Sequence, residues 1–246
     1  MTTRRTRTTA AALGMLCAGA LALTACGGPG DADEAFKGQK ADDIAAKAVA
    51  ATDKAPSVHL KGTSHLKGGN VVKVDIRVDD KGHCTGTMSG DGAEAELLRD
   101  GGDILIKGDE KFWTNSAKAS GGSGDQGAQL ADKLAGKWVK APADSADASL
   151  CDKKAFLASM DQDKSERRGL ERGDTGEVAG KDALALKKKG GKNLTMHVAT
   201  EGEPYLLRTE TKGSQPNDMT FSEYGKKVEV HQPADDEIVD PAHMTA

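Results

Sequence analysis

One cysteine near the N-terminus stands where its thiol could act as a nucleophile for lipid attachment. Cys26 ends the segment Leu23-Thr24-Ala25-Cys26 and is followed by two glycines. This order is that of a bacterial lipobox, in which the thiol takes up a diacylglyceryl group and the small residue before it exposes the peptide bond to a signal peptidase. Two acyl chains give a durable anchor, whereas one gives only marginal membrane binding. The motif predicts lipidation at Cys26.

The residues before this cysteine have the order of a signal peptide, over residues 1–25. Arg4, Arg5 and Arg7 form a positive start, and an uncharged apolar stretch runs from residue 10 to residue 23. As a helix this stretch would reach roughly 21 Å, short of the roughly 30 Å hydrocarbon core of a bilayer, which disfavours a permanent spanning helix. Ordinary secretory cleavage with an incidental cysteine is the alternative. Export through the Sec route or the twin-arginine route stays open.

The other cysteines leave one pair in the exported chain. Cys17 departs with the signal peptide and Cys26 carries lipid, so Cys84 and Cys151 remain. Disulfides persist outside the cytoplasm, and a bridge across this separation of 67 residues would stabilise the fold by about 4 kcal/mol on a chain-entropy argument. Two free thiols or a metal pair are the alternatives, although neither cysteine has further ligands at metal-binding spacing. We expect a Cys84–Cys151 disulfide.

Patterns typical of enzymes are missing from the sequence. The six histidines form no metal-binding spacing, and we expect His59 and His65 to be exposed on a strand face shared with lysines. No nucleophile elbow, phosphate loop or dinucleotide fingerprint occurs. We predict no catalytic residue, no metal site, no cofactor and no enzymatic activity. A polar pocket that joins distant His and Asp residues would favour an enzyme instead.

Charge and composition narrow the class of protein further. The chain has 34 Lys and Arg against 38 Asp and Glu, and loss of the arginine-rich signal segment makes it more acidic. An acidic body has no electrostatic reason to bind nucleic acid. Mixed charges favour a folded domain over disorder. Because aromatic residues make up only 3% of the chain, the core must be aliphatic.

The chain divides into four predicted segments. They are a signal peptide at 1–25, a lipidated cysteine with a flexible tether at 26–40, a single domain at 41–241 and a tail at 242–246. The domain opens with a helix over 41–54, in which Ile44, Ala48 and Val49 share one face and which Pro56 ends.

Strands dominate the rest of the predicted domain. The clearest alternation places Val72, Val74, Ile76 and Val78 on one face, and a preceding Gly-Gly-Asn turn predicts a hairpin with a strand over 60–66. Further strands are expected around Cys84 and over 97–98, 104–106, 111–114, 165–172, 176–188, 194–198, 205–211, 219–222 and 228–230. Helices are expected at 130–134 and 149–160, and a flexible Gly/Ser loop at 120–127.

Several motifs together make the sequence resemble a known group of envelope proteins. They are the lipobox, the Ala-rich helix, Ser57-Val58-His59, Gly136-Lys137-Trp138-Val139, Gly202-Glu203-Pro204-Tyr205-Leu206-Leu207-Arg208, Phe221-Ser222-Glu223-Tyr224-Gly225 and Val228-Glu229-Val230. With these motifs the chain resembles the LppX/LprG-type lipoproteins of actinobacteria, within the wider LolA/LolB-like group, over roughly residues 41–241.

The resemblance implies a fold and a function. The fold is α+β, with a strongly curved antiparallel sheet, like half a barrel, wrapped around a few helices. Better-known members hold lipids or acylated glycolipids between sheet and helices and help to move them across the envelope. The resemblance implies a cavity lined by apolar strand residues: Val72, Val74, Ile76, Leu97, Ile104, Ile106, Leu184, Leu186, Met196, Val198 and Leu207.

In a second interpretation, the protein has the same fold but binds no lipid. The same apolar residues would then pack a closed core, and the domain would be a non-catalytic interaction or sensing module with a protein partner in the envelope. Both interpretations place the protein on the extracytoplasmic face of the cell membrane, held there by its lipid anchor.

Overall fold

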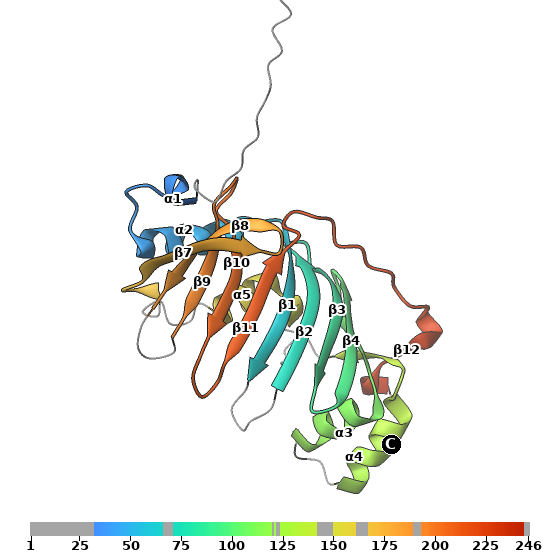
Figure 1. Cartoon of the computed structure of the whole chain (residues 1–246). Helices are drawn as coiled ribbons and strands as arrows, with labels where there is room; N and C mark the ends of the chain where they lie inside the picture. Colours follow the sequence, from blue (N-terminus) through green and yellow to red (C-terminus); the bar gives the residue numbers. More distant parts are fainter. Residues whose placement is uncertain are drawn as a thin grey trace, which may run out of the picture.

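A single curved sheet organises the chain. The computed structural model describes residues 32–65, 71–119, 121, 124–141, 150–160, 167–188 and 193–243. Within this part, a 12-stranded sheet runs in the order β12-β6-β5-β4-β3-β2-β1-β11-β10-β9-β8-β7 and does not close into a barrel (Figure 1). Neighbouring strands are antiparallel, except that β12 lies parallel to β6. The predicted class, a half-barrel sheet around a few helices, is confirmed.

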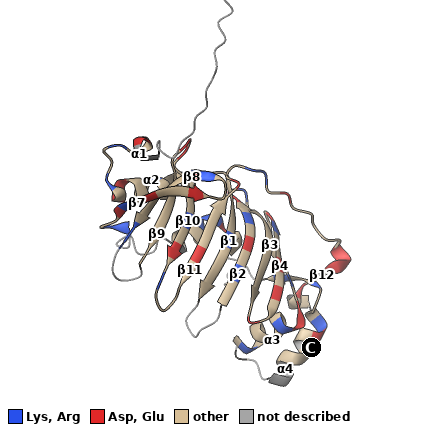
Figure 2. Cartoon of the chain, in the orientation of Figure 1, with Lys and Arg blue, Asp and Glu red and all other residues tan. Residues whose placement is uncertain are grey.

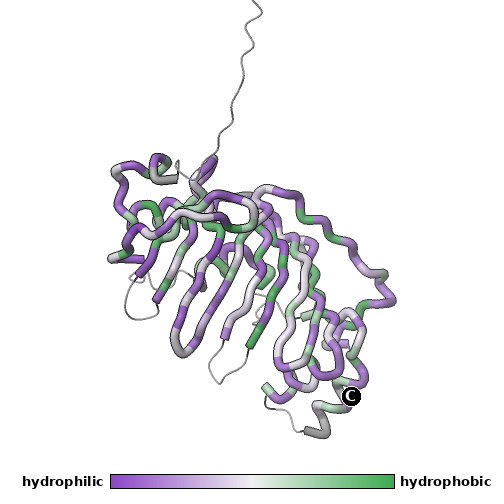
Figure 3. The backbone as a smooth tube through the Cα atoms, in the orientation of Figure 1, coloured by the Kyte–Doolittle hydropathy of each residue, from purple (hydrophilic) through white to green (hydrophobic). Residues whose placement is uncertain are grey.

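The strands follow one another mostly through short hairpin connections, as expected for antiparallel neighbours. Their bounds are β1 Ser57–His65, β2 Val71–Asp79, β3 His83–Gly90, β4 Ala93–Asp100, β5 Ile104–Gly108, β6 Trp138–Ala141, β7 Glu171–Val178, β8 Lys181–Lys187, β9 Thr195–Ala199, β10 Leu206–Thr211, β11 Asn217–Ser222 and β12 Ile238–Val239. Figure 3 shows the hydrophobic stretches within these strands and hydrophilic residues at the turns.

The helices lie at the two flanks of the sheet and behind its middle (Figure 1). They are α1 Ala32–Ala35, α2 Ala41–Lys54, α3 Glu110–Ala119, α4 Gly124–Leu134 and α5 Lys153–Met160. Helix α2 has the bounds that its sequence predicts. Its residues Ile44, Ala45 and Ala48 form one fully buried stripe, as expected for an amphipathic helix.

The folded domain begins earlier than residue 41. Phe36, in the segment expected to be tether, is only 6% exposed and belongs to the main hydrophobic cluster. The guanidinium of Arg172 donates a hydrogen bond of 2.7 Å to the Phe36 carbonyl oxygen. The predicted tether is therefore shorter on its domain side. The signal peptide and Cys26 lie outside the described residues.

Two predicted segments are helical instead of extended or loop. Residues 111–114, expected to be a strand, lie inside α3, and the Asp109 carboxylate accepts a 2.6 Å hydrogen bond from the Phe112 N–H, as an N-cap does. A segment of four residues is too short to separate a strand from a helical turn. The end of the predicted Gly/Ser loop at 120–127 also differs, because α4 already begins at Gly124.

The predicted C-terminal strands need three further corrections. The segment 176–188, expected as one strand with a bend at residues 179–182, forms two strands, since Ala179 and Gly180 adopt φ values of 51° and 78° and turn the chain between β7 and β8. The strand predicted over 165–172 begins only at Glu171. Residues 228–230 join no strand, and the chain instead runs on to the short strand β12.

Glycines allow the strands of the curved sheet to approach closely. A methyl group at Gly86 would lie 2.2 Å from the Asp75 carbonyl oxygen and 2.6 Å from the Ile76 Cα, both backbone atoms of the neighbouring strand. A methyl group at Gly62 would lie 2.1 Å from the Asp218 carbonyl oxygen. Neither strand can shift without breaking its ladder, so these sites require glycine.

We predict that Gly86→Ala lowers the free energy of unfolding by about 2 kcal/mol or more, because overpacking against backbone forces the strands apart. Gly176→Ala is the matched control, since a methyl group there meets nothing within 4 Å in strand β7; its effect should stay within about 0.5 kcal/mol. Urea unfolding measures both. Equal stabilities for the two variants would contradict the close approach.

Candidate ligand-binding face

The strand register aligns apolar side chains in rows on the helix-covered, concave face. One row crosses seven strands, six of which contribute a side chain, and each of these six is buried at no more than 3% exposure. Its members are Phe221, Leu60, Ile76, Leu97, Ile106 and Val139. Gly86 fills the position between Ile76 and Leu97. This row is a continuous aliphatic strip with one aromatic end.

Burial decreases along the strands toward one end of the sheet. On β2, Val78 and Ile76 are at most 1% exposed, Val74 is 8% exposed and Val72 is half-buried. The β1–β2, β3–β4 and β10–β11 connections gather at this less buried end. In the final cross-strand row, four neighbouring residues are half-buried, and we call these four the open row: Asn217, Ser64, Val72 and Gly90.

Helices cover the concave face from both flanks. On one flank, Ile44 and Ala48 of α2 pack in the main cluster, and α2 contacts β9 and β10. On the other flank, Trp113 of α3 and Leu134 of α4 join the same cluster, and α3 contacts β4 and β5. Helix α5 adds the half-buried Phe156. The aliphatic rows thus lie between sheet and helices, as the sequence predicts.

Most of the predicted cavity residues lie together on this face. Ten belong to the main cluster or pack against it: Val72, Val74, Ile76, Leu97, Ile104, Ile106, Leu184, Leu186, Met196 and Val198. Leu207 does not, because a bulge between Leu206 and Arg208 directs Leu206 to the concave face and Leu207 to a small cluster with Ala183 and Ala199 on the other face. A ligand cavity at these positions stays a prediction.

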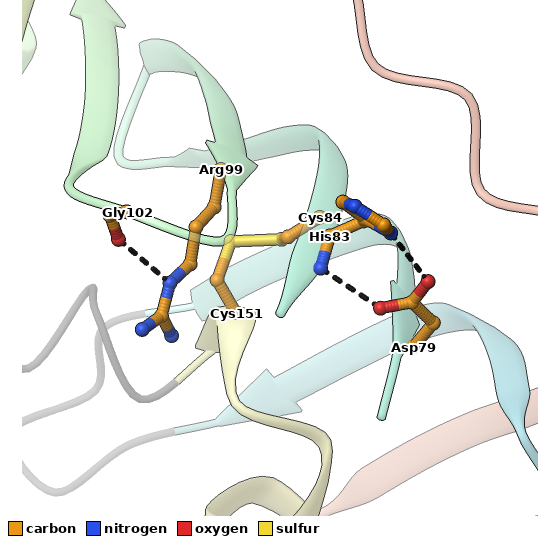
Figure 4. The surroundings of a disulfide bond; sticks show 6 residues. All are labelled: Asp79, His83, Cys84, Arg99, Gly102 and Cys151. Carbon is orange, nitrogen blue, oxygen red and sulfur yellow. Dashed lines mark hydrogen bonds and ion pairs between the residues drawn. A yellow bond between two sulfur atoms is a disulfide. The ribbon is translucent and has the colours of Figure 1, made fainter. Parts of the chain in front are cut away.

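A disulfide closes the end of the concave face opposite the open row. Cys84 and Cys151 are bonded, with their Cα atoms 5.4 Å apart, and they are 0% and 1% exposed (Figure 4). The predicted bridge is present. It fixes the start of α5 to strand β3, so that this helix is held against the sheet.

Lys153 provides a second attachment for α5, which sequence reasoning missed. Its side chain is 3% exposed, and its ammonium group donates hydrogen bonds to the carbonyl oxygens of Asp53 and Ala55. These carbonyls lie at the C-terminal end of α2, where a cation is favoured by the helix dipole and satisfies otherwise unpaired acceptors. A lysine in the first turn of a helix gives no local sign that it is buried.

An aspartate organises the turn beside the disulfide. The Asp79 carboxylate accepts hydrogen bonds from the backbone N–H groups of Lys81 at 2.9 Å and His83 at 2.8 Å, and its Oδ2 lies 2.7 Å from the His83 ring nitrogen (Figure 4). Burial alone would raise the pKa of Asp79, but these hydrogen bonds outweigh it and hold the pKa below its usual value.

The convex face carries a polar network in which His59 is central. Contrary to expectation, its side chain is only 12% exposed. Its Nε2 lies 2.6 Å from Asp75 Oδ1 and its Nδ1 lies 3.2 Å from Ser222 Oγ. A series of Ser, His and Asp is the arrangement that nucleophilic catalysis uses.

Other contacts give this series a structural role. Lys61 also binds Asp75, at 2.9 Å, while Arg77 holds Glu223, at 2.8 Å, within 3.7 Å of the His59 ring. The adjoining cavity measures about 60 Å³, far below the roughly 300 Å³ of small-ligand sites. The network joins β1 and β2 to β11, at the position in the sheet where a C-terminal strand lies beside the N-terminal strand β1.

Residues of both charge signs are distributed along the strands (Figure 2), and several of them form ion pairs on the convex face. The Arg208 guanidinium contacts the Asp218 carboxylate at 2.6 Å, and the His197 ring lies 3.1 Å from the Glu210 carboxylate. Within the described residues, no group of three or more His, Cys, Asp or Glu side chains is placed to hold a metal ion. From residue 32 onward, no described helix is long and apolar enough to cross a membrane.

Comparison with known proteins bears on the fold. No protein-family model matches the sequence, and a search of curated proteins finds no match. Among solved structures, the lipoprotein LprF from Mycobacterium bovis is 16% identical, with 79% of this chain and 97% of that chain covered and a TM-score of 0.50. The chain has the fold of the LppX/LprG-type lipoproteins. The predicted resemblance is thus confirmed for the fold.

Two further structures share the arrangement more loosely. LppX from Mycobacterium tuberculosis is 16% identical over 77% of this chain and 97% of that chain, with a TM-score of 0.47. The MucA/MucB complex of Pseudomonas aeruginosa contains a chain that is 18% identical over 80% of this chain and 59% of its own length, with a TM-score of 0.33.

A surface cavity of about 370 Å³ adds a local feature to this LppX/LprG-type fold. It lies at the ends of β3, β4 and β5, next to the start of α3. Met88 and Ala95 line it together with the carboxylates Glu94, Glu96 and Asp109. The cavity therefore brings apolar side chains of the concave rows and acidic groups to the same, less buried end of the sheet.

We predict that Asp79→Asn destabilises the protein by about 2 kcal/mol at pH 7, since it weakens several hydrogen bonds to a charged acceptor. Because the folded pKa of Asp79 is lowered, this stabilisation is complete above the unfolded value of about 3.9 and is lost as the pH falls through the folded pKa. Urea midpoints of wild type and variant should begin to approach each other below about pH 4 and should meet only at a pH below the folded pKa.

The exposed Asp182 on β8 supplies the control. Asp182→Asn should leave the urea midpoint nearly unchanged at every pH. A stability loss for Asp79→Asn that does not decrease at all as the pH is lowered from about 7 to about 2 would contradict the role of the carboxylate charge.

Proposed function

We propose that this protein is a membrane-anchored carrier that binds a lipid or an acylated glycolipid between its sheet and its helices. The burial gradient carries the proposal: the concave face is mainly apolar, sealed at the disulfide end and less covered at the open row. A surface of this kind accepts acyl chains lengthwise and leaves a polar group near solvent.

Dimensions and composition of the concave face support acyl chains as the cargo. From Val72 to Val78 the strand extends about 20 Å, which is comparable to a long acyl chain. The row that contains Ile76 is built from branched aliphatic side chains except for Phe221. Such a lining offers dispersion contacts without polar groups that a hydrocarbon would leave unpaired.

The anchor belongs to the same proposal. Lipidation at Cys26 would hold the domain on the extracytoplasmic face of the cell membrane, where lipids are available for capture or delivery. The tether between this lipid and the domain would be short, since Phe36 already packs in the domain core. The concave face would then work within a short distance of the bilayer.

We predict that the protein purified gently from its membrane carries lipid that native mass spectrometry detects, and that Met88→Trp reduces the bound fraction at least ten-fold. Met88 is half-buried on the concave face, so an indole there fills space that an acyl chain would use. Thr87→Trp is the matched control, because the neighbouring residue of β3 is exposed on the convex face.

Two outcomes would oppose the proposal. Wild-type protein without any bound lipid would favour the interaction module with a closed core. Equal lipid occupancy in Met88→Trp and Thr87→Trp would place the lipid elsewhere on the protein.

We predict that Cys26→Ser moves the protein from the membrane fraction to the soluble or secreted fraction, because the thiol that takes up the diacylglyceryl group is gone. Cell fractionation and immunoblotting measure the distribution. Cys17→Ser is the control, since Cys17 lies in the apolar stretch of the signal peptide and should leave anchoring intact. A Cys26→Ser protein that still pellets with membranes like wild type would refute the lipid anchor.

A further inference from the structure

We propose that the cargo presents a hydrogen-bond acceptor, such as an ester carbonyl, to the indole N–H of Trp113. This inference rests on the proposed lipid binding and narrows the ligand to acyl esters, as opposed to plain hydrocarbons or ether lipids.

The first observation is an unmet donor in an apolar setting. Trp113 is 9% exposed, and its Nε1 is buried without an acceptor in the described part of the protein. A buried donor is normally paired, because an unpaired one loses its hydrogen bond to water without compensation. The indole is a donor only, so its partner has to be an acceptor.

The second observation is the position of this donor. Helix α3 begins directly after β5, and Asp109 and Glu94 exchange backbone and side-chain hydrogen bonds of 3.0 and 3.1 Å beside the β3–β4 turn. Register aligns Gly90 of the open row with Ala93, the residue before Glu94. Trp113, four residues after Asp109, therefore lies at the less buried end of the concave face.

The indole is held in place by its neighbours. The ring of Phe112 packs edge-on against it, with ring centroids 5.1 Å apart and planes at 84°. Phe112 in turn lies against Gly108, where a methyl group would come within 2.3 Å of the phenyl ring. A fixed ring presents its N–H in a defined direction, which is the property that a recognition group needs.

The third observation is a second unpaired polar atom at the same end. The side-chain amide oxygen of Asn217, in the open row, is also buried without a partner among described residues. The rows beyond it, toward the disulfide, are mainly apolar. This distribution fits an amphiphile whose chains lie inward and whose ester or hydroxyl groups stay at the open row.

The test compares two probes with equal chain lengths, a diacyl glycerolipid with ester links and its dialkyl ether counterpart. We expect wild-type protein to bind the ester probe about five-fold more tightly, the effect of one net hydrogen bond, because an ether oxygen is a poorer acceptor than a carbonyl. In Trp113→Phe the ratio should fall to about one. Trp138→Phe is the matched control, since Trp138 is a half-buried residue of β6 beneath Lys107, and it should keep the wild-type ratio.

A second measurement does not depend on the folding of a variant. The chain has two tryptophans, so nitrogen-15 spectra of wild-type protein contain two indole signals, which Trp138→Phe assigns. The ester probe should move the Trp113 indole proton downfield, and the ether probe should move it much less. An unchanged ester-to-ether ratio in Trp113→Phe, or a Trp113 signal that responds equally to both probes, would overturn the inference. Wild-type protein that binds neither probe would overturn the proposed function and this inference with it.

Discussion

An open sheet cannot bury its own concave face, and this constraint governs the rest of the structure. Closed barrels cover their interior with strands alone, whereas here helices must cover the aliphatic rows from both flanks. The disulfide at Cys84 and the buried ammonium of Lys153 hold α5 and the end of α2 where that cover is needed. Glycines such as Gly86 allow neighbouring strands to approach closely, so that the sheet can curve around the helices.

The two ends of the concave face differ as a result. Where covalent and charge-assisted contacts fix the helices, the rows are sealed; at the open row, only half-buried residues remain. An interior that is firmly closed at one end and less covered at the other is suited to reversible uptake of long chains. The convex face needs no such cover, because ion pairs and the His59 network satisfy its polar groups across the strands.

Much of the secondary structure could be predicted from local sequence patterns. Alternation along β2 and the apolar stripe of α2 depend on neighbours within a few residues, and the structure reproduces both. Local signals failed where two conformations share a pattern. Residues 111–114 contain two aromatic residues, which favour strands, but they follow a capping aspartate and are helical. In the segment 176–188 the local sequence indicated a bend, but not that the bend is a complete turn between two strands, because Ala179 is an unusual residue for positive φ.

The sequence alone predicted lipidation at Cys26, because this depends on a short motif. It identified Cys84 and Cys151 as the remaining cysteine pair by counting. It also determined the face to which most strand residues point, because side chains alternate with a period of two. Only the tertiary structure decided that Leu207 faces away, that Lys153 is buried, that His59 lies among carboxylates and that burial declines toward the open row. These features arise from contacts between segments far apart in the chain, where a bulge or a distant carbonyl sets the environment of a residue, and no local pattern encodes that pairing.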